Sequence, residues 1–220
     1  MGVDVMGWVE VRPSYHKPDS DFDFDRQWVA VVSNVGFLAG RNYEMFGCLF
    51  GVRNHANFIP LAAERGIPDD ASEDVQHKWA EFNDRWPDEA FSPSWITWAE
   101  LKAVDWEAEA PRADSCIHQY KRDEQGQLVY VTKSSWDRRF AERVFAEHLD
   151  ESMRAAIMLP GVLAFPPGQE WEIDGVVYRS EKLKRKDALD DGWRMLFAIM
   201  EALAGQYGDD GVRLVAWFYW

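Results

Sequence analysis

Arginines and small polar residues stand next to apolar segments in the first half of the chain. The segment RNYEMFGCLFGVRN (41–54) has Arg41 at its start and Arg53 and Asn54 at its end. Backbone N–H groups at a helix start, together with an arginine, form a ready site for an anion. A helix of this length separates its two ends by roughly 15–18 Å. Arg41 and Arg53 are therefore not expected to hold one small anion together.

Further candidates follow this segment. Arg65 lies in the next loop, and Ser92-Pro-Ser94-Trp95 precedes a second apolar stretch. Aromatic rings beside arginine and small hydroxyls suit a planar or phosphorylated ligand. The predicted ligand-binding set is Arg41, Tyr43, Arg53, Asn54, Arg65, Ser92, Ser94 and Trp95. In the competing, purely structural interpretation the arginines tie loops to carboxylates and the serines cap helices.

The chain lacks the familiar catalytic signatures. It has no G-x-S-x-G, P-loop, H-E-x-x-H, C-x-x-C or G-x-G-x-x-G segment. Cys116 and His118 form a C-x-H pair, but a zinc site usually takes three or four protein ligands and no second cluster supplies the others. Nothing in the spacing selects a general base for Cys48 or Cys116. We therefore expect no metal and no cofactor, name no catalytic residue, and favour binding over catalysis.

The charge balance argues against direct nucleic-acid binding. Lys and Arg total 24 and Asp and Glu total 38, a net charge of −14. Residues 61–125 alone hold 16 acids and 7 bases, and so 16 − 7 = 9 of the excess negative charges. Such a field repels phosphate backbones. A surface that imitates nucleic acid stays open as an alternative.

The composition also indicates what kind of core the chain forms and in which cellular compartment we expect it. Twelve Trp, 13 Phe and 7 Tyr predict an aromatic-rich core. Two cysteines give no disulfide framework. The start MGVDVMGWVEVR lacks signal-peptide features, and no run approaches the ~18–20 apolar residues that span a bilayer. We expect no membrane segment and a reducing cytoplasm, and the oligomeric state cannot be read from these residues.

The first half of the chain is predicted to form short helices and strands. Alternation over 5–12 predicts a strand, 13–25 has the composition of a loop, and 27–32 fits either a strand or a helical turn. A buried helix follows Asn42 as its N-cap, with Gly47 and Gly51 inside it where another element packs closely. Ser72 caps a helix through about residue 84 with Val75, Trp79 and Phe82 as its buried stripe. Thr97 and Glu100 form a capping box.

The second half is more regular. Residues 105–125 are acidic and irregular, and 128–133 predicts a strand. Helical spacing continues from Ser135 to about 157. WEIDGVVY (171–178) predicts a hairpin with an Asp-Gly turn that pairs Ile173 with Val176. A helix over 183–205 and a final strand over 212–220 complete one α+β domain over 1–220, with helices packed on a mixed or antiparallel sheet and a sub-division near 105–125 as an option.

Four segments together resemble a widespread family of uncharacterised phage and prophage proteins. They are RNYEMFGCLFGVRN, ERGIPDDAS, SPSWITWAEL and the C-terminal VRLVAWFYW. Related members carry R-x-Y-x-L-F…G-V-R, R-G-x-P and serine-tryptophan segments in this order. The resemblance covers most of 1–101 and the last strand and is weak over 105–165. Several members have histidine-serine repeats before the tryptophan, where this chain has Phe91-Ser-Pro-Ser. The resemblance implies a viral or mobile-element context and supplies no reaction.

The leading functional prediction is a phage-type accessory protein that acts by binding, with counter-defence as one role. Its target would be a small anionic ligand such as a nucleotide, or a host protein, in the cytoplasm of a bacterial host. One alternative is an enzyme acting on a nucleotide or nucleic-acid component. The other is an acidic nucleic-acid mimic or protein-interaction module.

Overall fold

The computed structural model describes residues 2–13, 27–34, 38, 40–134, 137–144 and 165–220. Their elements, in chain order, are β1 (Asp4–Val11), β2 (Val29–Ser33), α1 (Tyr43–Phe50), α2 (Glu73–Arg85), β3 (Ala90–Thr97), α3 (Trp98–Lys102), β4 (Ile117–Arg122), β5 (Leu128–Ser134), α4 (Arg138–Val144), β6 (Glu170–Ile173), β7 (Val176–Arg179), η2 (Arg185–Ala188), α6 (Asp191–Tyr207), η3 (Asp209–Gly211) and β8 (Val212–Tyr219). They form two four-stranded antiparallel sheets and confirm the α+β prediction.

The C-terminal strand lies inside the first sheet, whose order is β2-β1-β8-β3. β8 pairs along its whole length with β1, from Asp4 opposite Tyr219 to Val11 opposite Val212, and with β3 on its other side. Both neighbours are antiparallel to it. The predicted final strand is therefore confirmed, and seven of its eight residues are buried.

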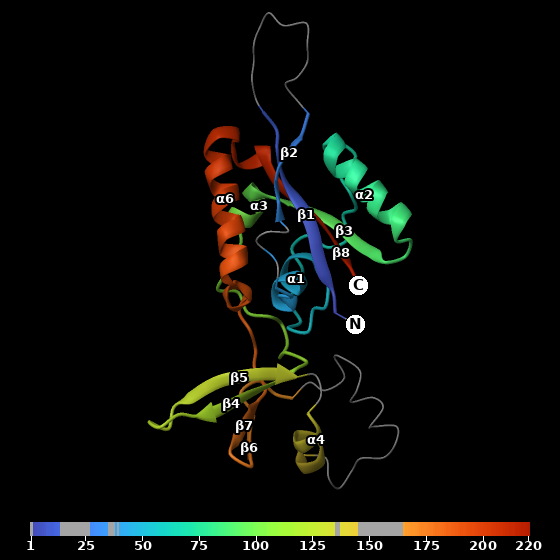
Figure 1. The fold of residues 1–220 in the computed structure, drawn as a ribbon. Helices are drawn as coiled ribbons and strands as arrows, with labels where there is room; N and C mark the ends of the chain where they lie inside the picture. The colour runs from blue at the N-terminus through green and yellow to red at the C-terminus, as the bar shows by residue number, and fades with distance from the viewer. Residues whose placement is uncertain (1, 14–26, 35–37, 39, 135–136, 145–164) are drawn as a thin grey trace, which may run out of the picture.

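Side chains of β1 and β8 alternate between two hydrophobic clusters, as the period of a strand requires. On one face Val9 and Leu214 pack with residues of α1 and α6. On the other face Trp217 packs against Trp8 and against Trp79 of α2. Figure 1 shows α6 and α2 on opposite sides of this sheet.

The second sheet has the order β5-β4-β7-β6. The predicted hairpin is confirmed, with Ile173 opposite Val176, and Asp174 and Gly175 both have positive φ. Phe140 of α4 packs on Trp171 and Tyr178 at ring-centroid distances of 5.0 and 5.2 Å. This packing explains why the short helix α4 lies on one face of the sheet (Figure 1).

Two chain segments connect the sheets and run beside each other. Ala110 N donates to Leu183 O at 2.8 Å, and Lys186 N donates to Trp106 O at 2.9 Å. Glu107 pairs with both Lys184 and Lys186. The single-domain prediction, with its option of a sub-division near 105–125, stays a prediction.

The same pairing corrects the predicted start of the helix over 183–205. α6 begins only at Asp191, and Asp190 is its N-cap, accepting from Trp193 N at 2.9 Å. Lys184 is extended and precedes a 3₁₀ turn over Arg185–Ala188, and both Lys184 and Lys186 pair with Glu107 across the connection.

Other predictions were partly right. Asn42 caps α1 as predicted, but Gly51 ends the helix in the left-handed region at φ +77 and does not lie inside it. Within α2 only Val75 is buried, while Trp79 and Phe82 are half-buried. The strand option for 27–32 is correct. β3 was not predicted, and β4 lies in the segment predicted to be irregular.

Some predictions lie outside the described residues. α4 confirms a short part of the helix predicted over 135–157, and residues 135–136 and 145–164 are not described. The predicted loop over 13–25 lies almost wholly outside the described residues as well. In the part of the chain that the structure describes, no helix has the length and apolar character needed to span a bilayer.

The close approach of β1 to β8 leads to a prediction about the stability of the fold. A Cβ at Gly7 would lie 2.1 Å from the backbone oxygen of Val215, so the strands would have to separate. We expect Gly7→Ala to lower the free energy of unfolding by about 1–3 kcal/mol, measured by urea denaturation. Gly205→Ala on α6 is the control: it enters open space and should raise stability by about 0.5–1 kcal/mol. A neutral Gly7→Ala variant would contradict the packing described.

Candidate functional site

A buried ion pair joins the first and last strands. Arg213 of β8 lies opposite Glu10 of β1, and its Nε donates to Glu10 Oε2 at 2.7 Å. Both side chains are almost fully buried. Burying two charges is costly unless further hydrogen bonds satisfy them. Asp70 accepts from Arg213 at 2.7 Å, and Glu10 Oε1 accepts from Ser72 N at 2.7 Å.

Two tryptophans enclose the Arg213 guanidinium. Its central carbon lies 3.8 Å from the ring centroid of Trp28 and 5.8 Å from that of Trp95. Arg12 lies over Trp28 and Arg65 lies over Trp95, each at 5.0 Å. These contacts join Arg12, Trp28, Arg213, Trp95 and Arg65 in a chain of alternating arginines and tryptophans, which we call the Arg–Trp ladder. Each cation–π contact stabilises it by roughly 0.5–2 kcal/mol.

The ladder forms part of the wall of an open hollow of about 590 Å³, which we call the ladder groove. Its lining residues are Arg12, Trp28, Arg65, Ile67, Pro68, Asp69, Asp70, Trp95, Thr97, Asp210 and Arg213. The volume lies in the ~300–1,000 Å³ range of small-molecule sites.

Hydrogen bonds hold the loop that forms one side of this groove. The buried Ser94 hydroxyl donates to Ala62 O and accepts from Arg65 N. Gly66 N donates to Pro93 O at 3.0 Å, beside the β-bulge where β3 skips register between Phe91 and Ser94. Trp28 Nε1 donates to Asp70 at 2.9 Å and so fixes the far end of the loop. The loop is therefore held at both ends.

The three guanidinium groups differ in how far they are already satisfied. Arg213 is bonded to Glu10 and Asp70, and Arg65 forms two hydrogen bonds with Glu100 at 2.7 and 3.0 Å. Burial raises the pKa of Asp70, but the hydrogen bond and positive charge of Arg213, together with the hydrogen bond from Trp28, outweigh burial, so the pKa of Asp70 is lowered overall. Arg12 is exposed and has no carboxylate within ion-pair distance among the described residues.

A second hollow of about 470 Å³ is lined by Arg53 and Ser92, together with Ala63 and Glu64 of the loop that precedes Arg65. Arg53 lies over Trp220 at 5.1 Å, and Trp220 stacks on Phe91 at 4.7 Å. Arg53, Glu64 and Ser92 all have positive φ, a conformation that is unfavourable for non-glycine residues. All three of these residues line the hollow.

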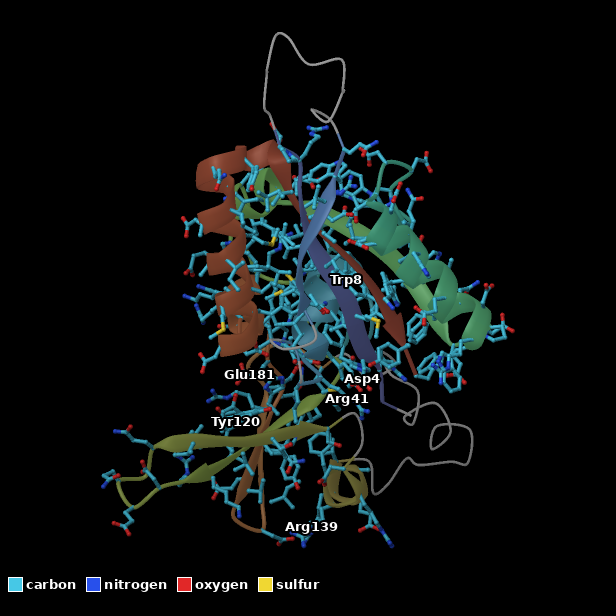
Figure 2. All side chains as sticks on the ribbon, turned by 45° about the horizontal axis from the view of Figure 1, so that its top comes forward. Asp4, Trp8, Arg41, Tyr120, Arg139 and Glu181 are labelled. Carbon is cyan, nitrogen blue, oxygen red and sulfur yellow. The ribbon has the colours of Figure 1, made fainter. Side chains whose placement is uncertain are left out.

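The other predicted site residues have structural contacts. Arg41 pairs with Asp4 on the surface at 2.9 Å, as Figure 2 shows at the start of β1. The Tyr43 hydroxyl accepts from Val3 N. Asn54 bonds both backbone groups of Phe58. A Cβ at Gly47 would lie 2.7 Å from Asn54, which accounts for that glycine.

The eight predicted residues therefore do not meet in one of the hollows described. Arg65 and Trp95 line the ladder groove, and Arg53 and Ser92 line the second hollow. Sequence reasoning missed Arg12, Trp28 and Arg213. Arg213 carried a usable signal, because a charged residue inside an apolar strand is rarely buried without a partner.

A partly buried charge cluster lies where the second sheet meets α1, with Asp114 and His118 buried and Lys133 and Glu44 half-buried. Lys133 Nζ lies 2.5 Å from Glu44 and 2.5 Å from Asp114, and His118 Nε2 lies 3.0 Å from Asp114. On the face of this sheet that turns toward the first sheet, Tyr120 donates to Glu181 (Figure 2). His118 beside an acid is what an enzyme site would need, yet it lines neither hollow described above.

Neither cysteine is poised as a nucleophile. Burial raises the pKa of Cys48 to about 11, and burial together with Asp114 raises that of Cys116 to about 12. Both thiols are therefore protonated near neutral pH. Within the described part of the chain, no three His, Cys, Asp or Glu side chains are grouped so that they could hold a metal ion.

Comparisons with known proteins add no assignment: no protein-family model, curated protein or solved structure matches the chain.

The charge cluster around Asp114, formed with Glu44, Lys133 and His118, leads to a prediction of how stability depends on pH. Burial alone raises the pKa of Asp114, but His118 and Lys133 together lower it to about 2, from 3.8. A carboxyl with a lowered folded pKa contributes stability above its unfolded pKa and loses it as the pH falls through the folded value. Urea unfolding at a series of pH values should show about 2 kcal/mol lost between pH 3.8 and 2 through this group. Asp114→Asn should flatten that decline, and an unchanged slope would contradict the assignment.

Proposed function

We propose that the protein acts by binding a small anionic ligand in the ladder groove. The observation that carries this is the Arg–Trp ladder itself: three guanidinium groups lie along one groove, each against one or two tryptophan rings. Groups held in place before binding lose little conformational entropy when a ligand arrives, which favours affinity.

The three arginines have different parts in this proposal. Arg213 is neutralised by Glu10 and Asp70, so it positions the two rings and Asp70 without acting as the anion's main partner. Arg65 keeps one edge of the groove in place through Glu100. Arg12 is the group whose N–H donors no carboxylate of the described chain occupies, and guanidinium binds phosphate or carboxylate with two parallel hydrogen bonds.

The biological setting is proposed from the resemblance to phage and prophage proteins. A binding protein of that kind would act as an accessory factor in an infected bacterial cell, where capturing an anionic metabolite serves counter-defence. A host protein as the target stays the alternative within the same binding function.

Calorimetric titration with nucleoside mono-, di- and triphosphates tests the proposal. We expect saturable binding that Arg12→Ala weakens by about 10- to 100-fold, because a hydrogen bond to a charged group contributes roughly 1.5–3 kcal/mol.

Arg41→Ala is the matched control. It also removes one exposed arginine. Arg41 is paired with Asp4, and it does not line the groove. Equal losses in the two variants would show that only overall charge matters and would contradict the site. If the protein binds none of the anions tested, the proposal itself is contradicted.

A further inference from the structure

The ladder groove is not simply basic. Three arginines line it (Arg12, Arg65 and Arg213), and three aspartates line it too (Asp69, Asp70 and Asp210). The side chain of Asp70 is occupied by Arg213 and Trp28. The exposed carboxylates of Asp69 and Asp210 accept no side-chain or backbone hydrogen bond and form no ion pair within the described residues.

This arrangement selects among anions. Charges that line one hollow of this size lie within or close to a Debye length of about 8 Å, so Asp69 and Asp210 repel a bare anion that approaches Arg12. Ionised carboxylates only accept hydrogen bonds. A ligand that fits both sets of groups must therefore carry an anionic end and, apart from it, several O–H or N–H donors.

The ladder also limits how a planar ring could bind. Arg12 and Arg213 lie over the ring of Trp28, and Arg65 and Arg213 lie near that of Trp95. A ligand ring therefore cannot insert between the tryptophans without displacing an arginine. A guanidinium plane can stack on an aromatic ring, and that of the exposed Arg12 is the partner left to such a ligand.

We infer that the ligand class is a nucleoside phosphate. This inference rests on the proposed binding function and specifies its ligand. The phosphate pairs with Arg12, while sugar hydroxyls or base amino groups donate to Asp69 and Asp210. A carboxylate that accepts from a ribose hydroxyl is a common way of holding the sugar of a nucleotide.

Two probes and one double variant test the ligand class. In calorimetry, the wild-type protein should bind adenosine or guanosine diphosphate at least tenfold more tightly than inorganic pyrophosphate. Asp69→Asn/Asp210→Asn should move the two affinities in opposite directions. Pyrophosphate should bind more tightly because the repulsion is gone, and the nucleoside diphosphate should bind about tenfold more weakly because its donors lose charged acceptors.

The control is Glu124→Gln/Glu172→Gln, which also removes two exposed negative charges, one from the turn between β4 and β5 and one from β6, and should leave both affinities unchanged because neither residue lines the groove. Both aspartates of the test variant are exposed, so folding should be unaffected, and thermal unfolding checks this.

The outcomes separate the two proposals. Two results would overturn the assignment of a nucleoside phosphate as the ligand: pyrophosphate binds as tightly as the nucleotides, or the double variant raises the affinity for both probes alike. Anion binding that depends on Arg12 would still stand. If no probe binds, the proposed function and this inference both fall.

Discussion

The pair between Glu10 and Arg213 is the constraint on which the rest of the structure depends. Two opposite charges lie in neighbouring central strands, and neither can be left unpaired because a buried lone charge destabilises a fold by several kcal/mol. Their remaining hydrogen-bonding groups reach Asp70 and the backbone of Ser72. The sheet, the loop over 60–70 and the start of α2 are thereby fixed to one another.

The second sheet is attached by a different set of charges. The two connecting segments are joined by backbone hydrogen bonds and by pairs between Glu107 and two lysines. Lys133 then links this sheet to Glu44 of α1. The ladder groove is built wholly from residues of the first sheet and the segments that flank it, so its geometry does not depend on the second sheet.

Local patterns predicted local structure well. The Asp-Gly hairpin, the Asn42 and Ser72 caps and the last strand depend on near neighbours in sequence, and all are present. The start of α6 was wrong because Lys184 and Lys186 pair with Glu107, which lies far away in sequence. Secondary-structure propensity and hydrophobic periodicity carry no information about such long-range contacts.

The residues of the candidate site were harder to predict from the sequence for the same reason. Of the ladder, only Arg65 and Trp95 were predicted, since they lie beside recognisable loop and cap motifs. Arg12, Trp28 and Arg213 come from the ends of three different strands, and only the strand order of the sheet brings them together. Glu10 and Arg213 interrupt apolar strands with opposite charges, and this was the one signal in the sequence that pointed to their pairing.

The claim that the ladder is a binding surface is tested most directly by following indole N–H signals in NMR spectra during titration with a nucleoside diphosphate. Trp28 and Trp95 line the groove, whereas Trp193 and Trp217 are buried in the two hydrophobic clusters and serve as internal references. Saturable shifts of the Trp28 and Trp95 signals, with those of Trp193 and Trp217 unmoved, are the predicted result. Shifts confined to Trp220 beside Arg53, or no shifts at all, would contradict the account.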